Sequence, residues 1–223
     1  MNKNNVSALR SSAESALATN KVLRNTYLLL SLTFIFSAFT AYFSFASGVR
    51  SINPLLVIAG VYGLMFMTHA LKNSPWGLVS VFAFTGFLGY SLGPILNSVA
   101  HFANGGQIIA TALGGTGLIF FALSGYVLTT RKDFSYLGGF LFVAVMVAFL
   151  AMIAGLFFQI PALQLIISAA FVLISSGLIL FQTSEIIHGG ETNYISATVG
   201  LFVSIYNLFI SLLNLLSAFS GRD

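Results

Sequence analysis

Long apolar stretches, separated by short polar segments, run through most of the chain. No Asp, Glu, Lys or Arg occurs between residues 51 and 71, between 73 and 130, or between 134 and 184. Because a helix needs about 20 apolar residues to cross the hydrocarbon core of a membrane, the second and third stretches each have room for two spans. The stretches lack the strict polar–apolar alternation of membrane barrels, so we expect helices.

The pattern predicts an all-α integral membrane protein, a bundle of seven transmembrane helices. Turn-forming pairs that contain Asn, Pro or Gly mark the connections, and no connection is long enough for a soluble domain. The expected spans are roughly 26–46, 53–71, 77–97, 107–129, 135–157, 161–181 or slightly beyond, and 195–217. The expected domains are a seven-helix transmembrane domain over 25–223 and a flexible tail over 1–24, which we expect to be mostly unfolded with at most a nascent helix.

Composition agrees with a lipid-facing surface. The chain is 57% hydrophobic and only 6% charged, whereas soluble domains carry about 25% charged residues. The net charge of +4 comes from basic residues scattered over the tail and the connections, which argues against nucleic acid as a partner. The chain has no cysteine, which excludes disulfides and thiolate chemistry.

The basic residues predict how the chain is oriented. If the tail is cytoplasmic, seven of the nine Lys and Arg residues lie on the cytoplasmic side, and only Arg50 and Arg222 lie on the other side. Cytoplasmic segments are enriched in Lys and Arg, so we expect the N-terminus inside and, after seven spans, the C-terminus outside.

Polar residues in the last predicted span recur on one helical face. Ser204, Asn207, Ser211 and Asn214 are spaced at three, four and three residues, and Gly200 extends the row. Asparagine facing lipid would be costly, so we expect this face to point into the bundle, Asn207 and Asn214 to be buried and hydrogen-bonded, and the last helix to be central.

The sixth predicted span carries a matching row, and the two rows should form a polar seam. The row consists of Gln164, Ser168, Ser175 and Gln182, and Glu185 follows on nearly the same face. We expect Gln182 and Ser204 at similar depth, and a helix that ends at Gly189-Gly190. Two interpretations stay open: the seam joins helices through small residues and hydrogen bonds, or it passes water, protons or ions.

Two glycine patterns indicate close helix packing. They are Gly86-x-x-Gly89-x-x-x-Gly93 and Gly114-Gly115-x-Gly117. Neither follows a strand, so neither is a nucleotide-binding loop.

The stretch FQTSEIIHGGETNY, residues 181–194, places Glu185, His188 and Glu191 three residues apart. A di-iron site of this kind would need a second Glu-x-x-His copy and more carboxylates, and no predicted span contains them. Intramembrane proteolysis would need a Gly-x-Ser-Gly string or two intramembrane aspartates, and neither is present. We therefore expect no metal, no cofactor and no catalytic residues, and we interpret the stretch as a polar helix end whose Glu185 could act as a gate or sensor.

Several strings resemble a bacterial inner-membrane member of the Bax inhibitor-1 family. They are KVLRNTYLLLS (21–31), FAFTGFLGYSLGPILN (82–97), YVLTTRKDFSYLGG (126–139) and SEIIHGGETNYISATV (184–199). The resemblance implies a seven-helix bundle with a central last helix, an inner-membrane location with a periplasmic C-terminus, and a role as modulator and substrate of the FtsH-type membrane AAA protease in quality control, alongside HflK and HflC.

The chain departs from the family's calcium-leak members at one place. The resemblance implies that those members carry two aspartates, as a pH-sensing pair, late in the sixth span and in the seventh. The matching positions here are Gln182 and Ser204, which do not ionise. A calcium or proton leak is therefore the alternative function, weakened by the loss of the pair, and Glu185 is the acid close enough to substitute.

Overall fold

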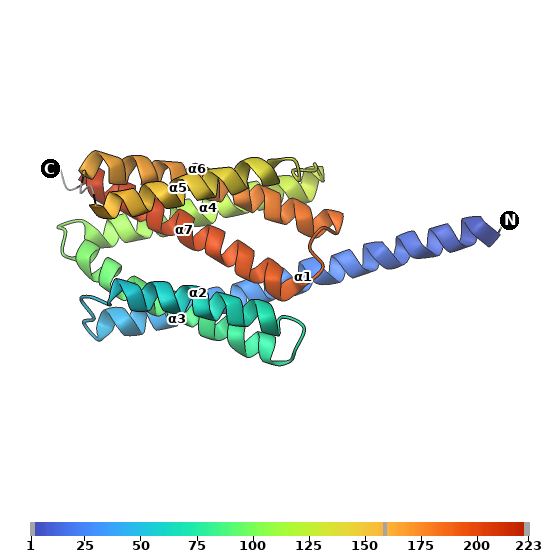
Figure 1. The fold of residues 1–223 in the computed structure, drawn as a ribbon, viewed down its shortest axis with the longest axis horizontal. Coiled ribbons are helices and arrows are strands. Elements are labelled where there is room, and N and C mark those ends of the chain that lie inside the picture. The colour runs from blue at the N-terminus through green and yellow to red at the C-terminus, as the bar shows by residue number, and fades with distance from the viewer. Residues whose placement is uncertain (1–2, 158–159, 221–223) are drawn as a thin grey trace.

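The protein forms a bundle of seven helices. The computed structural model describes residues 3–157 and 160–220, and these residues contain no strand. The helices are α1 (Lys3–Ala46), α2 (Pro54–Leu71), α3 (Trp76–Ala100), α4 (Gly105–Thr130), α5 (Leu137–Phe157), α6 (Pro161–His188) and α7 (Tyr194–Ser220) (Figure 1). Each is long and apolar enough to cross a membrane, which confirms the predicted fold class. The predicted spans agree within a few residues, except that the first candidate span starts at Thr19 and the sixth extends to His188.

The N-terminal segment differs from the expected unfolded tail. α1 begins at Lys3 and runs for 44 residues without a break, and its candidate membrane span lies within Thr19–Ala46. Once the span has nucleated a helix, each further residue adds a hydrogen bond at little cost, and the segment contains several alanines and leucines that favour helix. Its first turns project alone beyond the bundle (Figure 1).

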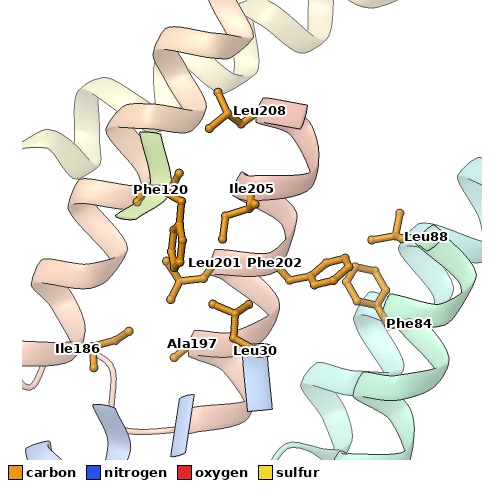
Figure 2. Close-up of a cluster of buried hydrophobic side chains, with 11 residues drawn as sticks. Leu30, Phe84, Leu88, Phe120, Ile186, Ala197, Leu201, Phe202, Ile205 and Leu208 are labelled. Carbon is orange, nitrogen blue, oxygen red and sulfur yellow. The ribbon is translucent and has the colours of Figure 1, made fainter. Parts of the chain in front are cut away.

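α7 is the central helix, as predicted. It packs against α1, α2, α3, α4 and α6, and it crosses between a group formed by α1, α2 and α3 and a group formed by α4, α5 and α6 (Figure 1). Phe202 reaches toward Phe84 of α3, and Leu201 lies beside Phe120 of α4 (Figure 2). These side chains are all buried, so the core is built around α7 on several sides.

The glycines of α3 allow α1 to approach closely. A Cβ atom on Gly89 would collide with Ser37, and one on Gly93 would collide with Ser44, which confirms this predicted close-packing pattern. The second pattern was predicted wrongly. A Cβ on Gly114 or Gly117 of α4 would have no atom within 4 Å, because this part of α4 borders open space.

α6 ends where its sequence predicts. Gly189 adopts the left-handed conformation with φ of +79°, which an L side chain rarely adopts. The backbone N–H of Gly190 donates to the Glu185 carbonyl at 2.9 Å, closing the last turn. The sharp turn brings the start of α7 back against the end of α6.

Candidate functional site

The polar seam between α6 and α7 centres on Gln182 and Ser204. The Ser204 hydroxyl shares its single hydrogen between Gln182 Oε1 at 3.0 Å and the Gly200 carbonyl at 3.1 Å. Ser204 is only 1% exposed, and a Cβ on Gly200 would lie 3.1 Å from Gln182 Nε2. The predicted equal depth of the two residues is confirmed, because glycine at position 200 leaves room for the amide.

The rest of the α7 row only partly follows the prediction. Ser211 is buried, but Asn207 is half-buried and Asn214 is exposed, and no hydrogen bond joins either amide to the described part of the chain. The prediction that both asparagines are buried and hydrogen-bonded was therefore wrong. At about 100° per residue, Asn207 is rotated about 60° and Asn214 about 80° from Ser204, whereas Ser211 is rotated only about 20°, so the two asparagines lie at the edge of the face that the two serines share.

On α6, the matching row is buried in its middle and exposed at its start. Ser168 and Ser175 are buried, and Gln182 is half-buried. Gln164 is exposed, because it lies in the first turn of α6 at the end of the bundle. The Ser175 hydroxyl has no hydrogen-bond partner among the described residues.

A polar cavity of about 250 Å³ lies between the end of α6 and the start of α7. Its polar lining comes from Gln182, Glu185, Glu191 and Ser196. The Ser196 hydroxyl oxygen is buried and lacks a partner in the described part of the chain. The Gln182–Ser204 hydrogen bond therefore lies at the edge of a small space that could hold water or a cation.

Glu185 and His188 also hold the loop between α4 and α5. The Ser135 hydroxyl donates to Glu185 Oε1 at 2.8 Å, and His188 Nε2 lies 3.1 Å from the Arg131 carbonyl. Ser184 accepts a hydrogen bond from the Phe134 N–H at 2.8 Å. The polar end of α6 is thus a docking point for this loop.

Asp133 completes this contact from the loop side. Its carboxylate accepts a hydrogen bond from the Ser135 N–H at 2.8 Å and lies 3.5 Å from the Ser184 hydroxyl. Hydrogen bonds from Ser135, together with the nearby His188, hold the pKa of the Asp133 carboxyl below its ordinary value.

The acids and the histidine of the stretch 181–194 do not converge on one point. Glu191 accepts a hydrogen bond from the Asn193 N–H in its own loop, while His188 contacts the α4–α5 loop. Within residues 3–157 and 160–220, no three His, Asp or Glu side chains are grouped so that they could hold a metal ion.

Sequence reasoning missed a cluster of three hydroxyls that joins α1, α4 and α6. The Tyr27 hydroxyl donates to Ser124 Oγ at 3.0 Å, and Ser124 Oγ lies 3.2 Å from Thr183 Oγ1. Thr183 directly follows Gln182, but its side chain points to another face of α6. Single hydroxyls on three different helices form no period, so no pattern in the sequence predicts the cluster.

Asn193 was also missed, and here a signal exists. Its side-chain oxygen accepts from the N–H groups of Ile195 and Ser196, which caps α7. Its amide nitrogen donates to the Lys72 carbonyl at 3.1 Å, linking the α6–α7 loop to the α2–α3 loop. Asparagine directly before an apolar helix is a typical N-cap.

Comparison with known proteins gives a consistent assignment. A model of the family described as Inhibitor of apoptosis-promoting Bax1 matches residues 19–221. An Escherichia coli (strain K12) protein named Modulator of FtsH protease YccA is 59% identical over 209 residues, which is 94% of each chain. A relative from Escherichia coli O6:H1, with the same identity and coverage, is named Inner membrane protein YccA. An uncharacterized protein of Pseudomonas aeruginosa is 54% identical over 202 residues, 91% of each chain.

Proposed function

The chain belongs to the Bax inhibitor-1 family, and from that premise we propose that it modulates, and is a substrate of, an FtsH-type membrane AAA protease in membrane-protein quality control. The observation that carries the proposal is a sequence identity of 59%, over 94% of the chain, with a relative named as a modulator of that protease. We further propose that the chain is not itself an enzyme, and that HflK and HflC accompany the protease as partners.

The distribution of basic residues supports a cytoplasmic N-terminus. The N-terminal part of α1, the α2–α3 loop and the α4–α5 loop carry seven of the nine Lys and Arg residues, and successive spans bring these segments to the same end of the bundle. Because cytoplasmic segments are enriched in Lys and Arg, this end faces the cytoplasm in our proposal and the C-terminus is periplasmic. The polar cavity beside Glu185 then opens on the side where a cytoplasmic protease acts.

We propose that the N-terminal part of α1 is the segment that the protease grips to begin extraction, and we call it the handle. Residues 3–18 precede the candidate span of α1, and the first turns of this helix project beyond the bundle (Figure 1), whereas the connections between helices are short. A protease that pulls a chain from one end needs such a segment. The bundle resists extraction because each apolar span must leave the bilayer, so the protein occupies the protease and slows its action on other clients.

The test is a pair of half-life measurements in cells. Deleting residues 3–18 should lengthen the half-life of the protein and strengthen its inhibition of a second membrane client of the protease. The matched control replaces the same residues with a scrambled sequence of equal composition, which should restore degradation. If the deletion variant and the full chain disappear at the same rate and the client's half-life is unchanged, the modulator mechanism is wrong.

A cation or proton leak is the second candidate function, and the polar cavity favours it. The cavity carries Glu185 and Glu191, and the Gln182–Ser204 hydrogen bond lies at its edge. Neither Gln182 nor Ser204 ionises, so we expect the unmodified chain to show weak or no acid-regulated calcium flux in proteoliposomes. Changing both positions to Asp should create pH sensitivity, whereas robust acid-regulated flux by the unmodified chain would favour the leak and point to Glu185.

A further inference from the structure

A large apolar groove of about 630 Å³ lies between α1 and α4, with α7 as its floor. α1 and α4 stand apart and meet at Tyr27, whose hydroxyl donates to Ser124. Along α1 the groove lining extends from Tyr27 to Phe45. At 1.5 Å per residue this is about 27 Å, close to the roughly 30 Å thickness of the bilayer hydrocarbon.

The groove presents almost only carbon to whatever fills it. The hydroxyls of Tyr27 and Tyr206 are hydrogen-bonded within the bundle, to Ser124 and Ser91 respectively. Thr116 donates to the carbonyl of Ala112 in its own helix. Because these polar groups are already used, the lining offers little to a polar solute and suits a hydrocarbon chain.

The dimensions of the groove favour an acyl chain. The groove is lined by the small residues Ala38 on α1 and Gly117 on α4 as well as by larger side chains. The space at the small residues suits a thin, flexible acyl chain.

A positive charge stands at one end of the groove. Arg24 lies three residues before Tyr27 and seven before Ser31, which places it on the same face of α1 as the groove lining. Arg24 is exposed. The Thr198 hydroxyl lies 3.3 Å from the Thr26 carbonyl, so Arg24 is close to the level at which α7 begins. This is the membrane boundary, where phospholipid phosphates lie.

We propose that this groove is a binding site for an anionic phospholipid, with an acyl chain between α1 and α4 and the headgroup phosphate at Arg24. The apolar lining, the bilayer-matched length and the charge at one end each correspond to one part of that molecule. The site is separate from the α6–α7 cavity and does not depend on the protease. Arg24 attracts a phosphate because a basic side chain near the membrane surface binds anionic headgroups.

The first test measures how much lipid stays bound. The full chain and its variants are reconstituted in vesicles of equal parts phosphatidylglycerol and phosphatidylcholine and are then extracted in mild detergent. Native mass spectrometry measures how many phospholipid molecules each protein retains. Gly117→Phe should fill the groove and abolish the retained phospholipid, and Ala38→Phe should do so from the α1 side. Gly63→Phe is the matched control, because a Cβ at Gly63 or Gly117 meets no atom within 4 Å and Gly63 lies on α2, away from the groove. Equal lipid retention by Gly117→Phe and Gly63→Phe would overturn the proposal.

The second test examines the headgroup and the rival occupants. Arg24→Gln should reduce the preference for phosphatidylglycerol over phosphatidylcholine about fivefold, as expected for one basic residue near an anionic surface, while Lys72→Gln at the end of α2 should leave it unchanged. The chain has no native cysteine, so Ala38→Cys can carry a single photo-crosslinker. Crosslinks to phospholipid support the site. Crosslinks to a second copy or to another protein's helix would show that the groove holds a transmembrane helix instead, and the proposal would be wrong.

Discussion

The hydrogen bond between Ser204 and Gln182 should couple the stabilities of α6 and α7. Ser204→Ala removes the hydroxyl that donates at 3.0 Å to Gln182 and at 3.1 Å to the Gly200 carbonyl. Ser204 is buried, but Gln182 is half-buried and lines the polar cavity, so water can replace part of what the amide loses. We therefore expect a coupling of about 0.6 kcal/mol, the mean from double-mutant cycles between membrane helices, and not above their maximum of about 1.7 kcal/mol.

The assay is a double-mutant cycle in mixed micelles. Sodium dodecyl sulfate unfolds each variant, and circular dichroism monitors the unfolding and gives its free energy. The cycle combines Ser204→Ala with Gln182→Ala, and the coupling is the departure of the double variant from the sum of the single variants. Asn97→Ala is the control partner for Gln182→Ala, because Asn97 binds the Phe45 and Val49 carbonyls at the other end of the bundle.

Additivity within about 0.3–0.5 kcal/mol is the normal result for independent sites, so the control pair should show it. If Ser204→Ala and Gln182→Ala are also additive, the two side chains do not stabilise the bundle through a shared bond. The seam between α6 and α7 would then be held by apolar packing alone, and the polar row would need another explanation.

Four further changes test other parts of the structure. Gly190→Ala should displace the Glu185 carboxylate, with which a Cβ would collide, and increase hydrogen exchange at the end of α6, whereas Gly139→Ala meets no atom within 4 Å and should not. Asn193→Ala should cost about 0.5–2 kcal/mol in unfolding free energy because it removes the α7 cap. Gly89→Ala should cost about 1–3 kcal/mol by overpacking α1 against α3, while the open Gly114→Ala should not destabilise. The lowered pKa of Asp133 means that its contribution is present above the ordinary value of 3.8 and is lost as pH falls through the lower folded value. The protection of residues 131–136 against hydrogen exchange, corrected for the intrinsic rate at each pH, should therefore fall in acid, and Asp133→Asn should remove that acid-induced step.

The helices and the central position of α7 could be predicted because membranes impose simple rules. Charges are absent from the middle of the spans, and a polar row at helical spacing must avoid lipid. The same rule failed for Asn207 and Asn214, because each follows a serine by three residues, a step that turns about 60° away from it on a straight helix. Ser204 and Ser211, seven residues apart and about 20° from each other, stay buried.

Contacts between distant segments could not be predicted from local patterns. The bond from Ser135 to Glu185 and the cluster of Tyr27, Ser124 and Thr183 each depend on how helices pair in space. Their members are single Ser, Thr or Tyr residues, which occur throughout the chain. The groove between α1 and α4 was missed for the same reason, since a lipid-facing apolar lining has the same composition as any other part of a span.

The packing of α1 explains how an accessible handle and a resistant bundle can exist in one chain. The segment that projects beyond the bundle continues directly into a helix that lies close to α3 along Gly86, Gly89 and Gly93. Below the projection, Tyr27 is hydrogen-bonded to Ser124 of α4. A force applied to the N-terminus is therefore transmitted, along one continuous helix, to a segment whose backbone closely approaches the glycines of α3. Pulling on α1 must separate it from α3, and also from α7 and α6, against which it packs. In our proposal the first step of extraction is therefore difficult, and a protease that has gripped this chain would be held there.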